Sequence, residues 1–318
     1  MSRTVLVIGG GGFVGGAILA ALAGTPGIAA RAGVRRRTAL PEGVATVLCD
    51  ALDPASLLRA LDGVSCVVNA VLAAPAAMVR VTANICAAAA AQSDPPRIIH
   101  LSSMAVYGAA TGLVDEASPL DAGGSAYAAA KIDSEAVIGR TVAGGRSAVI
   151  LRPGIVYGPG GQQWIGRICR LLRARRLGDL GAAGDGYCNL IHAADVGAAT
   201  LAALNAPAAG AYNLATKAPP RWNEVFLSLG LGIGAVPVPR IGARRLALES
   251  RMLAIPLQLA GRAGFATLPD VIPASLLRVF AQQIRLDPTR ADTLRFARTG
   301  DACGLAESAA WFAGQHPK

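Results

Sequence analysis

The first half of the chain alternates short apolar runs with longer stretches that have helical periodicity. The apolar runs have the length of buried β-strands. They lie at Val5–Ile8, Ala29–Val34, Ala45–Leu48, Cys66–Asn69, Arg97–Leu101 and Ala148–Leu151. Because strands that alternate with helices form a parallel sheet covered on both faces, the pattern predicts a doubly wound α/β sheet.

Three of the intervening stretches carry clear helix signals. Pro54–Leu61 follows Asp53, whose side chain can accept a backbone N–H as an N-cap, and proline suits the first helical position. Met78–Gln92 is ended by a nearby proline pair, and Ser125–Thr141 is the third predicted helix.

The pattern becomes less regular after Arg152, and helices dominate from Arg221 onward. Trp164–Arg176 is predicted to be one helix that holds five arginines. Leu190–Asp195 is predicted to be a short strand that enters a helix, and Ala211–Ala215 a late strand.

Composition narrows the class of protein. The mean hydropathy is high, at +0.45, but no uncharged apolar run reaches the ~20 residues that cross a bilayer. A run of glycines at positions 9–12 interrupts the first apolar segment, which argues against a signal peptide. We therefore expect no membrane span and a cytoplasmic location.

Cysteines, histidines and charge add three further expectations. The six cysteines form no Cys-x-x-Cys pair and the three histidines are scattered, so we expect buried thiols and no metal site. Residues 151–318 carry nine of the ten net positive charges. This bias is typical of a solvated basic face, with an acidic ligand or surface as the alternative, and no nucleic-acid partner is expected.

A glycine motif follows the first predicted strand directly. Gly9, Gly12 and Gly15 have the Gly-x-x-Gly-x-x-Gly spacing, and Phe13 and Val14 lie inside it. Glycine is needed where the chain turns sharply and where the backbone approaches a pyrophosphate. The following helix then presents free N–H groups to the phosphates. A strand, a glycine turn and a helix in this order predict a Rossmann-type site for a dinucleotide.

The end of the second predicted strand bears on the choice between NAD and NADP. An acidic residue there would hydrogen-bond the ribose 2′-hydroxyl, whereas an arginine would accommodate a 2′-phosphate. The chain has Arg35 and Arg36 at this point and no carboxylate, so we expect NADP, with NAD as the alternative. Further cofactor-binding residues are expected after the third and fourth strands, near the adenine and a ribose: Asp50, Ala51, Asn69 and Ala70.

A tyrosine and a lysine on one predicted helix supply acid/base chemistry. Tyr127 and Lys131 are four residues apart and therefore share a helix face. A tyrosine has an ordinary pKa of about 10, and a nearby ammonium and nicotinamide are expected to bring that pKa toward neutrality. Ser103 follows the fifth predicted strand, where α/β sheets place ligands, and its hydroxyl can hold the substrate oxygen. Ser102 is the weaker candidate for that role.

These motifs predict two lobes built from discontinuous segments. Residues 1–160 and 187–215 would form the Rossmann-type NAD(P)-binding domain. Residues 161–186 and 216–318 would form a smaller, mostly helical substrate lobe.

Taken together, the chain resembles an extended short-chain dehydrogenase/reductase of the NAD-dependent epimerase/dehydratase superfamily, nearly end to end. The resemblance rests on the glycine motif, the Tyr127/Lys131 pair, Ser103-Met-Ala-Val-Tyr-Gly108, Leu151-Arg-Pro-Gly-Ile-Val-Tyr-Gly158, Leu190-Ile-His-Ala-Ala-Asp-Val196 and Leu286-Asp-Pro-Thr-Arg290. It implies a catalytic triad of Ser103, Tyr127 and Lys131. It also implies that Arg152 and Pro153 border the nicotinamide. Lys131 can in addition hold the nicotinamide ribose, and the one assembly considered for the chain is a homodimer.

Two departures from the resemblance bear on the substrate. Many sugar-nucleotide members carry an arginine that holds the substrate diphosphate, and this chain has Cys188 at that place. Those members also usually end the second strand with an aspartate, where this chain has Val34 followed by Arg35. Both departures favour the branch similar to dihydroflavonol reductases and 3β-hydroxysteroid dehydrogenases.

The leading hypothesis is an NADP-preferring oxidoreductase that interconverts a secondary alcohol and a ketone, a small-molecule substrate. The alternative is a sugar-nucleotide epimerase or dehydratase with tightly bound NAD. A second alternative is a non-catalytic cofactor-sensing protein, which the intact triad of Ser103, Tyr127 and Lys131 disfavours.

Replacing Arg35 with Ala should weaken NADP(H) binding by roughly 10- to 100-fold, because a charge-assisted hydrogen bond to the 2′-phosphate is lost. NAD(H) affinity should be nearly unchanged and serves as the internal control in paired affinity titrations. Equal binding of both dinucleotides by the wild-type chain would remove the role given to Arg35.

Overall fold

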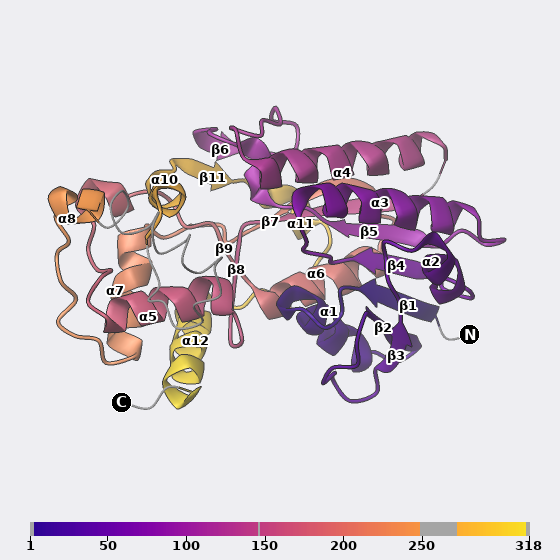
Figure 1. Ribbon diagram of the computed structural model, residues 1–318, viewed down its shortest axis with the longest axis horizontal. Helices are drawn as coiled ribbons and strands as arrows, with labels where there is room; N and C mark the ends of the chain where they lie inside the picture. Colours follow the sequence, from indigo (N-terminus) through magenta and orange to yellow (C-terminus); the bar gives the residue numbers. More distant parts are fainter. Residues whose placement is uncertain (1–2, 146, 249–271, 316–318) are drawn as a thin grey trace.

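Seven parallel strands form the central sheet of the protein, seen here in a computed structural model that describes residues 3–145, 147–248 and 272–315 (Figure 1). The strands are β1 (Arg3–Ile8), β2 (Ile28–Val34), β3 (Ala45–Leu48), β4 (Cys66–Asn69), β5 (Arg97–Leu101), β7 (Ala148–Pro153) and β10 (Gly210–Leu214). Their spatial order is β10-β7-β5-β4-β1-β2-β3, so the chain starts in the middle of the sheet and winds outward in both directions. The predicted doubly wound α/β sheet is confirmed.

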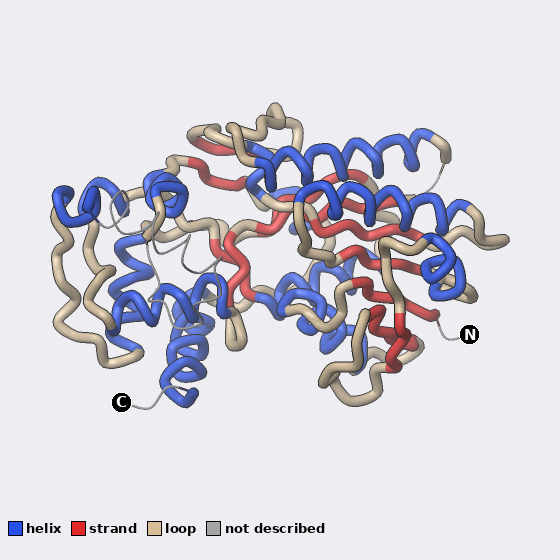
Figure 2. The backbone as a smooth tube through the Cα atoms, viewed as in Figure 1, coloured by secondary structure: helices blue, strands red, loops and turns tan. Residues whose placement is uncertain are grey.

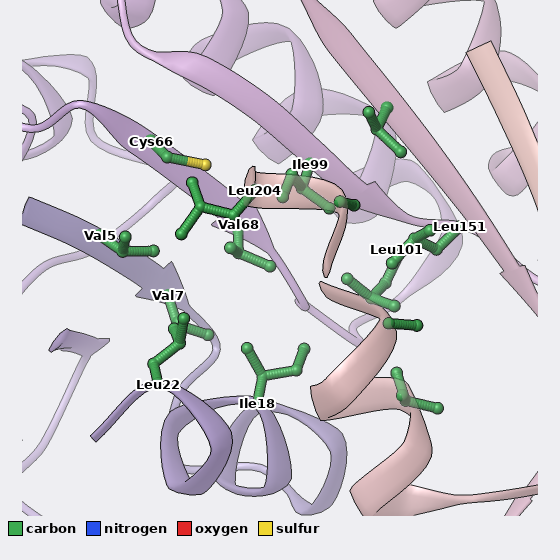
Figure 3. Close-up of a cluster of buried hydrophobic side chains, with 14 of the residues drawn as sticks. Val5, Val7, Ile18, Leu22, Cys66, Val68, Ile99, Leu101, Leu151 and Leu204 are labelled. Atoms are coloured by element: carbon green, nitrogen blue, oxygen red, sulfur yellow. The ribbon is translucent and has the colours of Figure 1, made fainter. Parts of the chain in front are cut away.

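Alternating residues of the strands face two different helical layers. Val5 and Val7 of β1 pack in a cluster with α1 (Phe13–Ala23) and α6 (Ala193–Asn205), which lie together on one face (Figures 1 and 3). Leu6 of β1 faces the other side. The layer on that side consists of α2 (Pro54–Ala60), α3 (Pro75–Ala90) and α4 (Ala126–Ala143). Both faces of the strands are therefore buried, as the continuous apolar runs require.

Local signals set the bounds of these elements. Asp53 caps α2 as predicted, with its Oδ1 accepting the Ala55 N–H at 3.0 Å. Ser125 caps α4 and accepts the Ala128 N–H at 3.3 Å. The caps satisfy N–H groups that have no partner within the first helical turn.

A second group of elements, mostly helical, lies beside the central sheet (Figure 2). These elements pack around an aromatic cluster of their own. Trp222 and Phe226 lie on α7 (Trp222–Gly232), and their rings pack against Phe280 with centroid distances of 4.8 and 4.9 Å. The helices and helical turns here are η2 (Gln162–Gly166), α5 (Arg167–Arg173), η3 (Gly181–Gly184), α7 (Trp222–Gly232), α8 (Ala243–Leu248), α10 (Ala274–Ala281) and α12 (Asp301–Gln315). The short helix α11 (Thr289–Asp292) lies beside β10.

Two small parallel sheets join this group to the central sheet. They are β8 (Ile155–Tyr157) with β9 (Leu190–His192), and β6 (Gly112–Val114) with β11 (Ile284–Leu286). The division into residues 1–160 with 187–215 and residues 161–186 with 216–318 stays a prediction, and positions 249–271 and 316–318 of the second unit lie outside the described residues.

The single helix predicted over Trp164–Arg176 is wrong in its ends. The segment begins with the π-helical turn η2 and continues as α5, which ends at Arg173. Arg175 then adopts a left-handed φ of 52°. The Arg176 N–H reaches back to the Leu171 carbonyl at 3.0 Å, which closes the helix with a Schellman turn. An arginine here takes the place usually held by glycine, so no residue type in the sequence marks this end.

Candidate active site

The glycine turn after β1 is held by close contacts between backbones. Gly9 has a φ of +85°, which glycine adopts readily, and a Cβ atom there would lie 2.8 Å from the Ala70 carbonyl oxygen. A Cβ on Gly15 would lie 2.2 Å from the Gly9 carbonyl oxygen. The Gly12 N–H closes the turn by donating to that same oxygen at 3.0 Å. Residues 9 and 15 must therefore be glycine for the turn to close.

The turn fits a dinucleotide pyrophosphate. Gly11 and Gly12 are exposed, and α1 begins directly after Gly12, which has no side chain to cap the helix. The first-turn N–H groups of this 11-residue helix are therefore available to an anion. Phe13 and Val14 in the same turn are half-buried.

The other residues predicted to bind the cofactor follow neighbouring strands. They differ in their exposure to solvent and in their hydrogen bonds within the protein. Arg35 and Arg36 are exposed after β2. Asp50 is exposed after β3, where its Oδ1 accepts the Leu52 N–H at 2.9 Å, and the following Ala51 is buried.

The side chain of Asn69 makes its hydrogen bonds within the protein. Its Nδ2 lies 3.1 Å from both Thr82 Oγ1 and His100 Nδ1, and its Oδ1 accepts the Val71 N–H at 3.2 Å. The side chain thus fixes the end of β4, while Ala70 contributes the carbonyl that packs on Gly9.

The three residues predicted to be catalytic come together at the end of β5. Tyr127 and Lys131 lie one turn apart on α4, and the Lys131 Nζ is 5.9 Å from the centre of the Tyr127 ring. Ser103 starts the 3₁₀ turn η1 (Met104–Tyr107), where its Oγ accepts the Ala105 N–H at 3.2 Å. The Ser103 hydroxyl also interacts with the Tyr127 phenol, whose pKa it lowers. Lys131 is buried and donates to the Leu101 carbonyl at 2.6 Å.

Burial shifts the proton affinities of this group. Desolvation raises the pKa of Tyr127, and the hydrogen bond with Ser103 partly offsets that rise. The pKa of Lys131 falls to about 8 because its ammonium is buried, although the charge of Glu135 opposes the fall. The expected lowering of the Tyr127 pKa is therefore not found in the chain alone, because the Lys131 ammonium points to the Leu101 carbonyl and burial dominates at the phenol.

Arg152, predicted to border the nicotinamide together with Pro153, forms a buried ion pair. Its Nη2 lies 2.6 Å from Glu135 Oε2 and its Nε lies 3.0 Å from Oε1. Its Nη1 donates to the Tyr107 hydroxyl at 2.8 Å and to the Glu116 carbonyl at 3.1 Å. All three guanidinium nitrogens thus have partners within the protein. A contact between Arg152 and a cofactor would therefore involve other atoms of this residue, such as its backbone.

Glu135 belongs to this site but was not predicted from the sequence. Its carboxylate accepts hydrogen bonds from Arg152 and from Ser102, the serine that was the weaker catalytic candidate. The available signal was spacing, since Glu135 lies four residues after Lys131 and eight after Tyr127 and so shares their helix face.

The position at which related sugar-nucleotide enzymes hold a diphosphate-binding arginine is shielded from solvent in this protein. Cys188 is fully buried, and desolvation raises the pKa of its thiol well above the usual range. Nearby, Asp195 accepts the Thr299 N–H, at 3.0 Å on Oδ1 and 2.9 Å on Oδ2. His192 caps α6 and makes an edge-to-face contact with the Tyr157 ring. Both residues therefore act in the structure of this region.

Two absences can be stated for residues 3–145, 147–248 and 272–315. No group of three His, Cys, Asp or Glu side chains in these ranges could hold a metal ion. No helix in the same ranges is long and apolar enough to cross a membrane.

Comparison with known proteins adds a family and several structures of the same fold. The model of the NAD dependent epimerase/dehydratase family matches residues 5–215. MoeE5 in complex with UDP-glucuronic acid and NAD is 24% identical, with a TM-score of 0.74 and coverage of 98% of this chain and 99% of that chain. No curated protein matches the chain.

Two sugar-nucleotide epimerases have similar structures. UDP-glucuronic acid 4-epimerase from Bacillus cereus in complex with NAD is 17% identical, with a TM-score of 0.74 and coverage of 99% and 100% of the two chains. UDP-glucose 4-epimerase from Thermus thermophilus in complex with NAD is 19% identical, with a TM-score of 0.74 and coverage of 98% and 99%. At these identities the likeness concerns the fold.

Replacing Gly15 with Ala should cost about 1–3 kcal/mol of stability and abolish dinucleotide binding, because the added Cβ meets backbone that cannot move aside. Gly16→Ala is the matched control in the same helix, since its Cβ would make only an ordinary contact at 3.9 Å with the Gly10 carbonyl. That variant should gain about 0.5–1 kcal/mol from helix propensity. Thermal unfolding and cofactor titration measure both effects, and similar behaviour of the two variants would contradict the role of the turn.

Proposed function

The chain belongs to the NAD dependent epimerase/dehydratase family, and from this we propose that it transfers hydride between a nicotinamide cofactor and a secondary alcohol or ketone. The observation that carries the proposal is the meeting of Ser103, Tyr127 and Lys131 at the end of β5, two strands from the glycine turn. Ligands of open α/β sheets bind at this edge, beyond the carboxyl ends of the strands.

Each member of the triad has a separate task. Tyr127 gives a proton to the substrate oxygen during reduction, or takes one during oxidation. Ser103, whose hydroxyl interacts with the phenol, holds the same oxygen within reach of it. Lys131 places a buried ammonium 5.9 Å from the centre of the Tyr127 ring. Together with the positive charge of an oxidised nicotinamide, this ammonium would favour the phenolate when the alcohol is oxidised. A bound nicotinamide would supply the hydride acceptor or donor.

Cys188 supports an uncharged substrate. A diphosphate taken out of water needs charged partners, because an unpaired buried charge is costly. The side chain at this position is a neutral, fully buried thiol. We therefore favour apolar ketones and alcohols as substrates, which corresponds to the branch of reductases and hydroxysteroid dehydrogenases.

The second candidate is a sugar-nucleotide epimerase, in which hydride leaves and returns to the same substrate. It is favoured by the structures in complex with UDP-sugars and NAD that align over 98–99% of the chain. The same triad would serve this reaction. The two candidates differ in how the diphosphate would be neutralised and in whether NAD remains bound between turnovers.

NADP is the proposed cofactor of the oxidoreductase. Arg35 and Arg36 are exposed at the end of β2, where they are free to meet a 2′-phosphate. The family description and the structures in complex with NAD support NAD as the cofactor of the epimerase candidate.

Replacing Tyr127 with Phe should reduce turnover by roughly 10²–10⁴-fold, because the proton donor is lost while the ring still packs. Cofactor affinity should change little. Tyr187→Phe is a suitable control, since that hydroxyl accepts a hydrogen bond from Arg221 away from the triad. Turnover of the Tyr127 variant above about half that of the wild type would show that another group transfers the proton.

A ligand screen with cofactor present separates the two candidate substrates. We expect apolar ketones and alcohols to stabilise the protein against thermal unfolding and to be turned over. UDP-sugars should bind weakly, because Cys188 offers no charge to a diphosphate. Micromolar binding and turnover of a UDP-sugar would establish the epimerase candidate instead.

A further inference from the structure

Three consecutive residues at the end of β5 are each held by a different turn of α4. The Leu101 carbonyl accepts from Lys131 at 2.6 Å. The Ser102 hydroxyl donates to Glu135, and the Ser103 hydroxyl interacts with the phenol of Tyr127. The three helix residues are spaced four apart, so one helix face fixes the register of this strand end.

Glu135 is the last of these three residues along α4, and its carboxylate is held by Arg152 and Ser102. Its side chain is 6% exposed, as is that of Arg152, which binds it through two parallel hydrogen bonds. With the bond from Ser102 added, both carboxylate oxygens are satisfied. A paired and fully hydrogen-bonded buried carboxylate is rigid, and its charge has a fixed position relative to the rest of α4.

We propose that Glu135 is a positioning residue for the reaction, whose buried carboxylate keeps the Lys131 ammonium charged and locks α4 to the end of β5. The inference rests on the proposed function, in which that ammonium acts on Tyr127. Glu135 acts through Ser102, which donates to its carboxylate, and through Lys131, which its charge affects.

The negative charge of Glu135 favours the charged form of the Lys131 side chain. The burial of Lys131 favours its neutral amine, and the charge of Glu135 is the opposing influence on its pKa, which lies at about 8. His100 on β5 does not compete for the carboxylate, since burial lowers its pKa to about 3 and the ring is neutral. Without Glu135, a larger fraction of the protein molecules would have an uncharged Lys131 amine at neutral pH.

Several other titratable groups lie on α4 or on the elements packed against it. None of those named below supplies a negative charge in place of Glu135. Arg152 of β7 is positive and is bound to Glu135 itself. Burial raises the pKa of the Tyr107 phenol of η1, which is therefore neutral. From α3, the thiol of Cys86 is buried. Tyr127, on α4 itself, also has a raised pKa.

The experiment uses the small number of lysines in the chain, which are Lys131, Lys217 and Lys318. Protein labelled with ¹³C at lysine Cε gives three signals whose pH titration reports each ammonium directly, without cofactor or substrate. A Lys131→Met variant assigns its signal. Lys217 is the internal control, because it is 67% exposed and pairs with Asp292 instead. Glu135→Gln keeps the shape and the hydrogen bond from Ser102 and removes the charge.

In Glu135→Gln we expect the Lys131 titration to move down by roughly one pH unit, with that of Lys217 unchanged. With a substrate that is turned over, activity of the wild type should fall as the pH rises through about 8. In the variant, the midpoint of this fall should lie at a pH lower by the same amount. An unchanged Lys131 titration, with only thermal stability reduced, would show that Glu135 is purely structural and overturn the proposal. A moved titration with an unmoved activity profile would also overturn it.

If Glu135→Gln fails to fold because Arg152 is left unpaired, the double variant Glu135→Gln/Arg152→Met removes both buried charges and is measured in its place. The Lys131 titration should again lie below that of the wild type. Absence of turnover by the wild-type protein with any candidate substrate would count against the proposed function alone, since the lysine titration needs no reaction.

Discussion

The register between α4 and the end of β5 is the constraint on which the candidate site depends. Leu101, Ser102 and Ser103 each have a partner on α4, so a shift of the helix by one residue would separate all three pairs. The buried pair of Arg152 and Glu135 extends this constraint to β7, the neighbouring strand. Removing one partner from such a pair typically costs about 3–5 kcal/mol, because it leaves a buried charge uncompensated.

The parts of the fold that follow from local chemistry could be predicted from the sequence. The strand Cys66–Asn69 and the cap at Asp53 were predicted with the bounds that the structure has, because burial on both faces and capping both depend on adjacent residues. The spacing of Gly9 and Gly15 could be read for the same reason, since the close contact between them is made within one turn.

The interactions that the sequence could not supply join residues distant along the chain. Arg152 was predicted to border the cofactor, but its guanidinium pairs with Glu135, a contact that arises only when α4 packs against β7. The amide of Asn69 bonds to Thr82 and His100 in the same way. The raised pKa of Tyr127 depends on how much protein surrounds it, which spacing along a helix does not reveal. The sequence thus indicated which groups gather at the site better than how each is held.

The central claim is that Tyr127 and Ser103 hold the reacting oxygen of a substrate beside a dinucleotide on the glycine turn. The most direct measurement is a crystal structure of the chain with an oxidised nicotinamide dinucleotide and a secondary alcohol. We expect the pyrophosphate at the N-terminus of α1 and the alcohol oxygen within hydrogen-bonding distance of both hydroxyls. A dinucleotide bound elsewhere, or an alcohol oxygen facing another base, would contradict the claim.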